Sequence, residues 1–477
     1  MRDFFRKNTF IGGVEILFRL PLIFTAGYLA RSVGPDAYGN WAVVIVYYGF
    51  MASVAGLGLS VSISRLAAVA PAVRARAYLG VAFRSTGVAL LAAAALTLVF
   101  QPWLGDVLGV TTKFRHLFAF SSLLAMATVA EQLLDAYFKA QERLTRFVFL
   151  VLARTAIEII AVLATFHNAQ VGGPQAESLL ATYVLWVVAM KVLVYPWLLA
   201  GRRGGGRGNI PLPPAERKEF LRYGLPMVPT ALLAWFIAQG DRLVLSHQID
   251  KSSLGIYAFS ASLAANMVYI GYAVYPLLLP RASRLYEEGN IEELKTLFRR
   301  SQQLTFLLLS MVMLCLALFG REVLLWTAGE KFIGEGLILL VLAFAIGMDQ
   351  VLGIHQYLFH LTKRAKWIFW LNLPQGIILL LAVWLSAAVG GIRWVPWGVL
   401  VGVLISNTIR YEVARRFLPI PRPDYLMTAL AGLLAAAWAM AWAVQDIALG
   451  PRIAVAAGLS AVIFILLSSA RRWNVAA

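Results

Sequence analysis

Charged side chains recur at helical spacing inside long apolar segments of the first half of the sequence. They are Glu15 and Arg19, Arg84, Glu131 and Asp135, Arg154 and Glu158, and Lys191. Residues four apart lie on one face of a helix, so each of the three pairs presents its two charges together. A charge inside a hydrocarbon layer costs about 3 kcal/mol or more unless it is paired or hydrated. Each of these residues is therefore a candidate functional residue.

The basic members of this set predict an anion site. Arg19, Arg154 and Lys191 lie well inside their segments, whereas Arg84 lies near a segment end, where a long side chain can reach the membrane surface. Guanidinium groups match phosphate oxygens with two parallel hydrogen bonds. We therefore predict a water-filled cavity in which Arg19, Arg84, Arg154 and Lys191 bind an anionic substrate.

The acidic residues have two competing explanations. In the first, the intrahelical salt bridges Glu15–Arg19 and Arg154–Glu158 stabilise helix packing and touch no substrate. In the second, a carboxylate couples a proton or another ion to movement of the substrate. The candidates for ion coupling or ion pairing are Glu15, Glu131, Asp135, Glu158 and Asp349.

The second half of the sequence has fewer such residues. Asp241 and Arg242 lie close to a segment end, where an interfacial salt bridge competes with an outer gate as their explanation. Asp349, His355 and His360 share one segment, but the two histidines are about 140° apart around a helix. Asp349 and His360 share a face but lie about 16 Å apart along the axis. We therefore predict no metal site, no cofactor and no catalytic residue.

The composition is that of a membrane protein. Of 477 residues, 60% are hydrophobic and 14% are charged, whereas a soluble domain is about 25% charged. The single cysteine, Cys315, excludes a disulfide framework and a cysteine-based zinc site. The basic N-terminus precedes an apolar stretch without a small-residue cleavage site, which predicts a retained first helix.

Fourteen apolar segments are long enough to cross a bilayer as helices, each crossing needing about 20 residues. They cover about 9–30, 38–60, 79–100, 117–138, 146–167, 178–199, 223–247, 255–279, 302–325, 336–360, 367–388, 395–413, 426–445 and 452–470. The predicted fold is therefore an all-α integral membrane protein of about 14 transmembrane helices. A basic, Gly- and Pro-rich stretch at 201–219 predicts a cytoplasmic linker. It separates a first six-helix lobe at 1–200 from a second at 220–416, and two additional helices follow at 417–477.

The distribution of the 42 Lys and Arg residues predicts the orientation. When the N-terminus is placed in the cytoplasm, every second connection is rich in Lys and Arg, and the outer loops carry few. This is the positive-inside pattern, and it places both termini in the cytoplasm. The formal net charge of +18 is thus mostly a topology signal and does not require a nucleic-acid partner.

An internal repeat relates the two halves. Residues 29–42 resemble residues 245–258, which matches Gly39 with Gly255 at an offset of 216. Both copies follow an odd-numbered segment, so they have the same orientation, and the axis that relates them runs along the membrane normal. We expect two lobes in a pseudo-twofold arrangement, with a substrate path between them.

Several motifs resemble those of a known transporter family. Residues 28–39, 56–59 and 64–65 look like the N-terminal signature of the polysaccharide transporters, and 241–245 with 254–257 are similar to the second-lobe motif of the same family. This family contains the Wzx-type flippases for lipid-linked oligosaccharides. It belongs to the MATE-like, or MOP, superfamily, which includes the lipid II flippase.

The resemblance implies a function and its partners. The chain would move an undecaprenyl-pyrophosphate-linked oligosaccharide, a repeat unit of O-antigen, capsule or exopolysaccharide, across the bacterial inner membrane by alternating access. The polyprenyl tail would stay in the membrane lipids while the cationic cavity binds the pyrophosphate and sugars. A polysaccharide polymerase or glycosyltransferases of the same pathway are the implied protein partners.

Two other functions compete with this one. A MATE-type multidrug exporter shares the fold but favours acidic sites for cationic drugs, and the deep cations argue against it. A membrane glycosyltransferase or O-antigen ligase would be an enzyme. No outer loop is long enough for a catalytic domain and no nucleophile constellation is evident, so we expect the protein not to be an enzyme.

Overall fold

The computed structural model describes residues 17–18, 21–167, 175–200, 212–333, 337–362, 364 and 366–417. These residues form helices joined by short connections, and no strand occurs among them. The chain divides into two compact units. Unit 1 is Met1–Phe259 with Ala387–Ile392, and unit 2 is Ser260–Ser386 with Arg393–Ala477. Of the predicted segments, residues 9–16 and 19–20 of 9–30, the whole of 426–445 and 452–470, and the linker part 201–211 lie outside the described residues.

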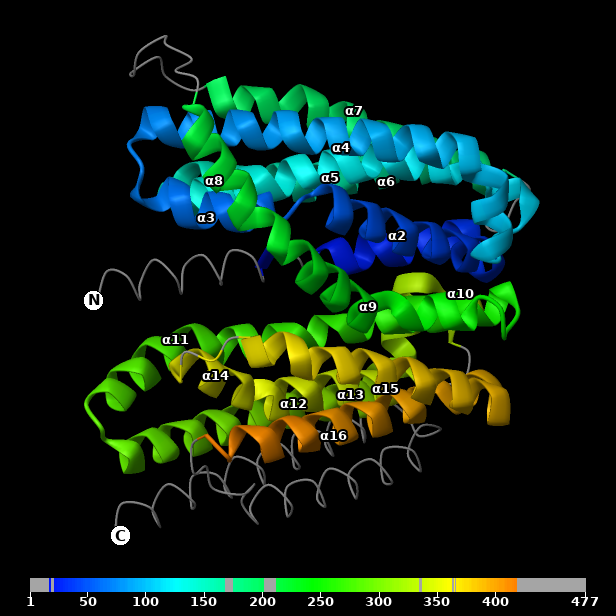
Figure 1. Cartoon of the computed structure of the whole chain (residues 1–477). Helices are drawn as coiled ribbons and strands as arrows, with labels where there is room; N and C mark the ends of the chain where they lie inside the picture. The colour runs from blue at the N-terminus through cyan, green and yellow to red at the C-terminus, as the bar shows by residue number, and fades with distance from the viewer. Residues whose placement is uncertain are drawn as a thin grey trace. The chain divides into compact units, whose positions relative to one another are not determined.

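The helices follow the apolar segments of the sequence (Figure 1). Unit 1 contains α2 (Pro35–Ala55), α3 (Leu59–Val69), α4 (Ala72–Val107), α5 (Leu117–Ala140), α6 (Leu144–Phe166), α7 (Ala176–Ala200), α8 (Pro214–Gly224), α9 (Val228–Leu245) and most of α10 (Lys251–Ala264). Unit 2 contains α11 (Val268–Glu287), α12 (Ile291–Ala328), α13 (Leu337–Gly353), α14 (Tyr357–Leu361), most of α15 (Lys366–Gly390) and α16 (Val395–Ala414).

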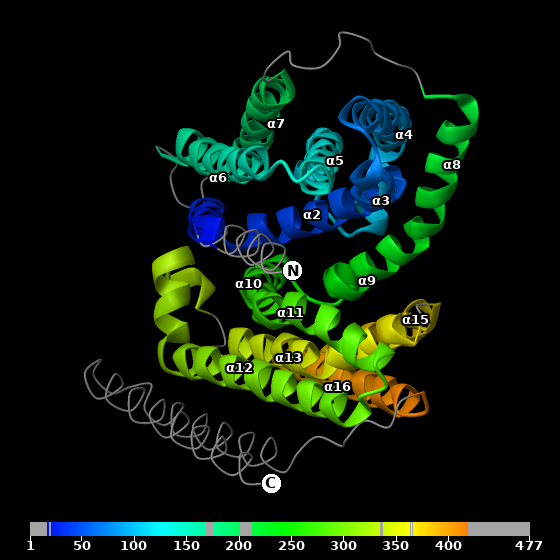
Figure 2. The ribbon, with the colours of Figure 1, turned by 90° about the vertical axis from the view of Figure 1, so that its left-hand side faces the viewer.

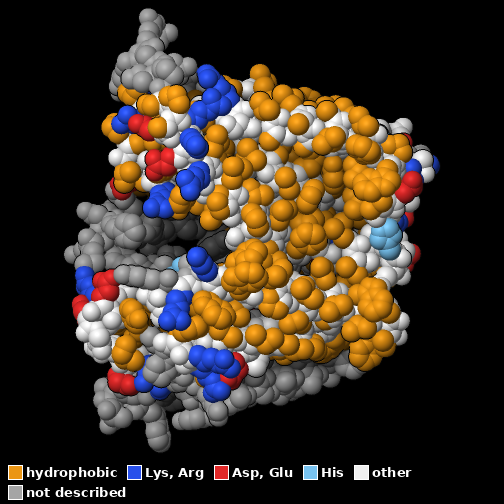
Figure 3. Space-filling view, in the orientation of Figure 1, with side chains coloured by type: hydrophobic (Ala, Val, Ile, Leu, Met, Phe, Trp, Pro, Cys, Tyr) orange, Lys and Arg blue, Asp and Glu red, His pale blue; other side chains and the backbone are white. Residues whose placement is uncertain are grey.

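The helices have the length and surface of membrane spans. Within the described ranges, nine helical segments are long and apolar enough to cross a membrane, or ten if α2 and α3, bent by 46°, form one span. The exposed face of α4 carries Val88, Leu91, Val99 and Trp103. Figure 3 shows that apolar side chains cover the visible face of the unit 1 helices, while Lys and Arg gather toward one end. Lipid is the solvent that such a surface requires.

The internal repeat is visible in the helix boundaries. Helix α2 begins at residue 35 and α10 at residue 251, an offset of 216. Helices α4 and α12 begin at 72 and 291, and α7 and α16 begin at 176 and 395, both at an offset of 219. The order of helices in the first half is therefore reproduced in the second.

The two matched glycines of the repeat lie against each other in unit 1. A Cβ atom added to Gly39 would clash with the carbonyl of Lys251 and lie 3.1 Å from the amide nitrogen of Gly255. A Cβ atom added to Gly255 would clash with the carbonyl of Pro35 and lie 3.0 Å from the amide nitrogen of Gly39. Pro35 and Lys251 are also separated by 216 residues, so the contact is reciprocal. Glycine is needed because α2 and α10 cross with their backbones in contact.

Two hydrogen bonds stabilise the helices around this glycine contact, one at the start of α10 and one between α9 and α2. The side chain of Asp250 accepts a hydrogen bond of 2.8 Å from the backbone N–H of Ser253 and so caps the start of α10. This hydrogen bond lowers the pKa of Asp250 below its usual value. On α9, the buried indole of Trp235 donates a hydrogen bond of 3.1 Å to the carbonyl of Val46 in α2.

One helix is central in each unit. In unit 1, α5 contacts α2, α3, α4, α6 and α7, and Figure 2 shows it surrounded by them. In unit 2, the matching helix α13 contacts α11, α12 and α16. A polar residue such as Glu131, on a face of the central helix that packs against its neighbours, is buried and needs polar partners.

Candidate functional site

A cavity of about 460 Å³ lies in unit 1 between α2, α5, α6, α7 and the helical residues 21–33. Its polar and aromatic lining consists of Thr25, Tyr38, Trp41, Tyr48, Thr128, Glu131, Arg154, Glu158, Tyr183 and Lys191. The remaining lining residues are aliphatic. A cavity with an apolar wall and a few convergent charges has the character of a ligand site.

Glu131 of α5 is the centre of the charged cluster. Its Oε1 atom lies 3.1 Å from Nη1 of Arg154 in α6, and its Oε2 atom lies 2.9 Å from Nζ of Lys191 in α7. The hydroxyl of Tyr195 donates to the same Oε2 at 2.9 Å. One carboxylate from the central helix therefore binds both neighbouring helices through charge-assisted hydrogen bonds.

Glu158 forms the second half of the cluster. Its Oε1 atom lies 3.7 Å from Nζ of Lys191, and its Oε2 atom accepts a hydrogen bond from the hydroxyl of Tyr183. Lys191 thus lies between two carboxylates and is 4% exposed. Two cations face two anions, so the formal charge of the cluster is zero.

Two of the nitrogen atoms of the Arg154 guanidinium group have no hydrogen-bond partner among the described residues. Its Nη1 atom binds Glu131, but its Nε and Nη2 atoms have no hydrogen-bond partner among the described residues. These two atoms form one edge of the guanidinium fork, which matches two oxygens of a carboxylate or a phosphate. Because buried donors without partners are unfavourable, this edge is suited to an acceptor from a ligand or from water.

The cluster differs from the predicted salt bridges in its connections. The expected pair Arg154–Glu158, four apart on one helix, is wrong: Arg154 binds Glu131 of α5, and Glu158 faces Lys191 of α7. The pairing follows from the faces of α5, α6 and α7 that meet, which bring Glu131 to Arg154 and Lys191 to Glu158. The pair Glu15–Arg19 lies outside the described residues.

Other predicted residues of unit 1 lie away from the cavity. Arg84 is exposed on α4 and does not line the cavity. Asp135 pairs with Lys139, four residues on, at 3.0 Å and does not line it either. The hydrophobic spacing of α5 and α4 does not reveal which face points to the cavity, and this limits prediction from the sequence alone.

Asp241 and Arg242 do not form the predicted salt bridge with each other. The hydroxyl of Tyr257 in α10 donates to Oδ2 of Asp241 at 2.6 Å, and the backbone N–H of Arg242 donates to Oδ1 at 2.8 Å. The Arg242 side chain donates to Gln239 at 3.3 Å. The carboxylate therefore links α9 to α10, because adjacent residues on a helix point in different directions.

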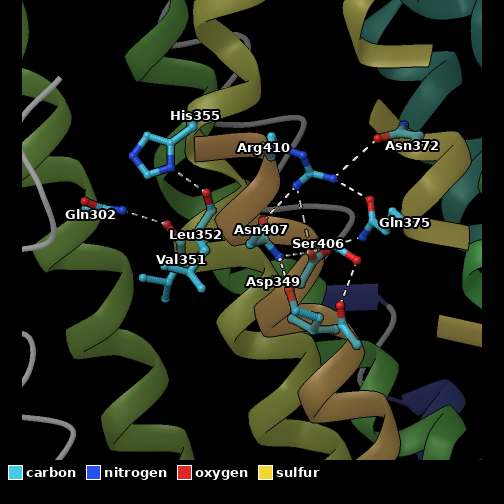
Figure 4. Close-up of polar contacts among 12 residues, drawn as sticks. Gln302, Asp349, Val351, Leu352, His355, Asn372, Gln375, Ser406, Asn407 and Arg410 are labelled. Carbon is cyan, nitrogen blue, oxygen red and sulfur yellow. Dashed lines mark hydrogen bonds and ion pairs between the residues drawn. The ribbon is translucent and has the colours of Figure 1, made fainter. Parts of the chain in front are cut away.

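Unit 2 contains a second polar cluster around Asp349 (Figure 4). The Oδ1 atom of Asp349 accepts hydrogen bonds from Asn407 at 2.8 Å and from Gln375 at 3.4 Å, and it lies 3.9 Å from Nη1 of Arg410. Arg410 also donates to Asn407 at 2.9 Å, to Asn372 at 3.4 Å and to Gln375. The cluster joins α13, α15 and α16.

The two histidines of this region are not part of that cluster. The ring of His355 contacts the carbonyl of Leu352 at 2.8 Å through Nδ1, as Figure 4 shows. Within the described ranges, no group of three or more His, Cys, Asp or Glu residues is placed to hold a metal ion.

The sequence did not single out several residues of the two sites. In unit 1 these are the tyrosines at 48, 183 and 195 and Trp41, and in unit 2 they are Asn372, Gln375, Asn407 and Arg410. Aromatic and amide residues are common in membrane helices, so their type alone carries no signal. Arg410 lies within the predicted segment 395–413, three residues before its end, and the sequence analysis did not select it.

Comparison with known proteins places the chain among membrane transport folds. Its architecture is similar to that of the "Lipid II flippase MurJ, inward closed conformation", with a TM-score of 0.70 at 13% identity, covering 98% of this chain and 100% of that one. It is also similar to a structure described as the inward-facing conformation of a multidrug resistance MATE family transporter of the MOP superfamily. That match has a TM-score of 0.65 at 15% identity and covers 87% of this chain and 96% of the other. At these identities the likeness shows the fold, which is all-α and MATE-like.

Sequence comparison extends this result. An "Uncharacterized membrane protein" of Haemophilus influenzae is 25% identical over 189 residues, which cover 38% of this chain and 45% of that protein. The alignment thus spans about half the length of that relative. Residues 28–334 match the sequence profile of the family described as "Polysaccharide biosynthesis protein". This match covers more than half of the 477 residues and includes every charged residue that lines the cavity. The chain is a multi-pass membrane protein that belongs to the polysaccharide biosynthesis protein family.

Proposed function

We propose that the protein is a flippase that moves an undecaprenyl-pyrophosphate-linked oligosaccharide across the bacterial inner membrane by alternating access. The transported unit would be a repeat unit of O-antigen, capsule or exopolysaccharide. The proposal includes the orientation expected from the Lys and Arg distribution, with both termini in the cytoplasm. The family membership and the MATE-like fold support it.

The observation that carries the proposal is Arg154, which lines the unit 1 cavity and has two buried nitrogens, Nε and Nη2, without a hydrogen-bond partner among the described residues. A pyrophosphate offers several oxygen pairs that fit this edge, and Lys191 lies in the same cavity wall. Tyr38, Trp41 and Tyr48 add amphipathic surface with polar edges, which suits a headgroup of mixed polar and apolar faces.

The electrostatics of the cavity favour an oxyanion over a cationic drug. Each carboxylate already faces a cation: Glu131 is bound by Arg154 and Lys191, and Glu158 lies 3.7 Å from Lys191. A cationic ligand would have to compete with these fixed charges, whereas an anionic ligand finds free donors. Ion coupling through Glu131 or Glu158 is part of the proposal, because an arriving anion changes the balance of charge around them.

Transport in reconstituted vesicles tests the proposal. The purified protein should move a lipid-linked oligosaccharide between leaflets, and Arg154→Ala should reduce the rate at least tenfold at equal protein abundance. Arg74→Ala is the matched control, because Arg74 is exposed on α4 and pairs with Glu216 outside the cavity. Export of a cationic dye without movement of the lipid-linked oligosaccharide would instead identify a multidrug exporter.

A further inference from the structure

The polar clusters of the two units occupy equivalent positions in the internal repeat. The helices α2/α10, α4/α12 and α7/α16 begin at offsets of 216 to 219, whereas α5/α13 and α6/α15 begin at offsets of 220 and 222. Four cluster residues of unit 1 meet four cluster residues of unit 2 at such offsets. The matched pairs are Glu131 with Asp349 (218), Arg154 with Asn372 (218), Glu158 with Gln375 (217) and Lys191 with Arg410 (219).

The equivalent residues also make equivalent contacts. In unit 1 the cation of α7, Lys191, contacts the carboxylate of α5 at 2.9 Å and Glu158 of α6 at 3.7 Å. In unit 2 the cation of α16, Arg410, lies 3.9 Å from the carboxylate of α13 and donates to Gln375 of α15. Each repeat therefore joins three helices around one cation from its last helix. An acid–cation pair between the matching helices is common to both.

The repeats differ on the middle helix of the three. Unit 1 has two charges there, Arg154 and Glu158 on α6, whereas unit 2 has the amides Asn372 and Gln375 on α15. The two amides serve Arg410 as acceptors, as Figure 4 shows. The described side chains of the unit 2 cluster contain no buried polar atom without a partner. In unit 1, by contrast, Arg154 keeps two unpartnered donor atoms beside a cavity.

We infer that Arg154 and Glu158 are the residues that convert a structural polar cluster, present in both repeats, into the oxyanion-binding site of the first repeat. The inference rests on the proposed function. Arg154 contacts a phosphate through its Nε–H and Nη2–H groups, while Glu131 and Glu158 together balance the charges of Arg154 and Lys191 when the cavity is empty. The pairs Glu131–Lys191 and Asp349–Arg410 hold the helices together and do not select the ligand.

The second repeat supplies the variant that tests this division. The double change Arg154→Asn and Glu158→Gln gives the first repeat the amides that the second repeat uses. It removes one positive and one negative charge, so the net charge of the cavity is unchanged and general attraction of anions is preserved. The change removes the guanidinium fork together with the Arg154–Glu131 ion pair and the Glu158–Lys191 contact, and it leaves the Glu131–Lys191 pair in place.

The measurement is thermal unfolding of the purified full-length protein in detergent, with and without undecaprenyl pyrophosphate as the probe. We expect the probe to raise the unfolding temperature of the native protein. Without the probe, the double variant should still unfold cooperatively, at a temperature lowered by the loss of the Arg154–Glu131 ion pair. It should need at least tenfold more of the probe for the same shift. Asn372→Ala, which alters the unit 2 cluster, is the control and should keep the native response.

Each outcome separates the inference from the proposed function. An unchanged probe response in the double variant would overturn the inference while leaving pyrophosphate binding intact. Aggregation of the double variant would also overturn it, because the amide pair would then not be a stable alternative in the first repeat. If the native protein itself shows no response to the probe, the proposed function fails. For the structural half of the inference, Lys191→Met and Arg410→Met should each lower the unfolding temperature, and an unchanged temperature in both would contradict it.

Discussion

Replacement of Glu131 by Gln isolates the stabilising role of the charge at the centre of the unit 1 cluster. The substitution keeps the shape of the side chain and one carbonyl oxygen but removes the negative charge. Glu131 is 8% exposed and accepts hydrogen bonds from Arg154 at 3.1 Å, Lys191 at 2.9 Å and Tyr195 at 2.9 Å. Without the charge, two buried cations face each other with Glu158 as their remaining carboxylate.

Two independent estimates give the size of the effect. Interhelical polar contacts in membrane proteins contribute about 0.6 kcal/mol on average and at most about 1.7 kcal/mol. Three such contacts give about 2–5 kcal/mol. Loss of one partner from a buried ion pair costs about 3–5 kcal/mol, because the other charge stays buried. We therefore expect Glu131→Gln to lower the free energy of unfolding by about 3 kcal/mol.

A residue one turn further along α5 provides the matched control. Asp135 pairs with Lys139 at 3.0 Å, and both side chains are 34% exposed. For an exposed pair four residues apart the expected contribution is only about 0.3–0.5 kcal/mol. Unfolding of the purified variants in mixed micelles of dodecyl maltoside and increasing dodecyl sulfate, followed by circular dichroism, measures both. Equal losses for Glu131→Gln and Asp135→Asn, or a loss below about 1 kcal/mol for Glu131→Gln, would refute the assignment of Glu131 as the centre of the cluster.

Three other predictions test the fold around the cavity. Gly39→Ala and Gly255→Ala should each lower the free energy of unfolding by about 1–3 kcal/mol, because the added methyl group meets a backbone carbonyl, and micelle unfolding should give similar losses for the two. Asp250→Ala should cost about 1 kcal/mol at pH 7 through loss of the helix cap. Folding lowers the pKa of Asp250, so its carboxylate contributes fully to the free energy of unfolding above the ordinary aspartate pKa. This contribution is lost as the pH falls through the lowered pKa of the folded state. The difference in stability between Asp250→Ala and the native protein should therefore disappear in acid. Trp235→Phe should cost about 1 kcal/mol by leaving the carbonyl of Val46 without its donor, and a native unfolding curve for this variant would exclude the α9–α2 hydrogen bond.

The fold could be predicted from the sequence because its signals are long and redundant. A helix that crosses a membrane must be apolar for about 20 residues, and this pattern located α5, α6, α7, α15 and α16 within a few residues. Helices α4 and α12 extend well beyond the predicted segments 79–100 and 302–325. The repeat also left a trace strong enough to match Gly39 with Gly255. The bends were harder: α2 and α3 are separated by a break at Gly56–Gly58, where positive backbone angles at Leu57 and Gly58 redirect the chain.

The candidate site could be predicted only in part. The charge of Arg154, Glu158 and Lys191 inside apolar segments was sufficient to select them, since each would be unfavourable there without a partner. Their pairing was not predictable, because it depends on which faces of α5, α6 and α7 meet. The same reason applies to Arg410, whose partners come from two other helices. The repeat offset, applied residue by residue, would have indicated it: Lys191 shifted by 219 is Arg410.

The reciprocal contact of Gly39 and Gly255 bears on how such a chain can evolve after a duplication. Gly39 contacts Gly255, the equivalent residue of the other repeat. In a symmetric dimer of a half-length protein, one mutation at this position would change both residues of the contact at once. Fusion of the two copies into one chain removes that constraint, and the halves have since diverged at most positions, including Arg154 and Asn372. At the crossing of α2 and α10 both halves have glycine, because one methyl group on either side would separate both backbones. The two glycines thus keep, at this contact, a symmetry that Arg154 and Asn372 no longer share.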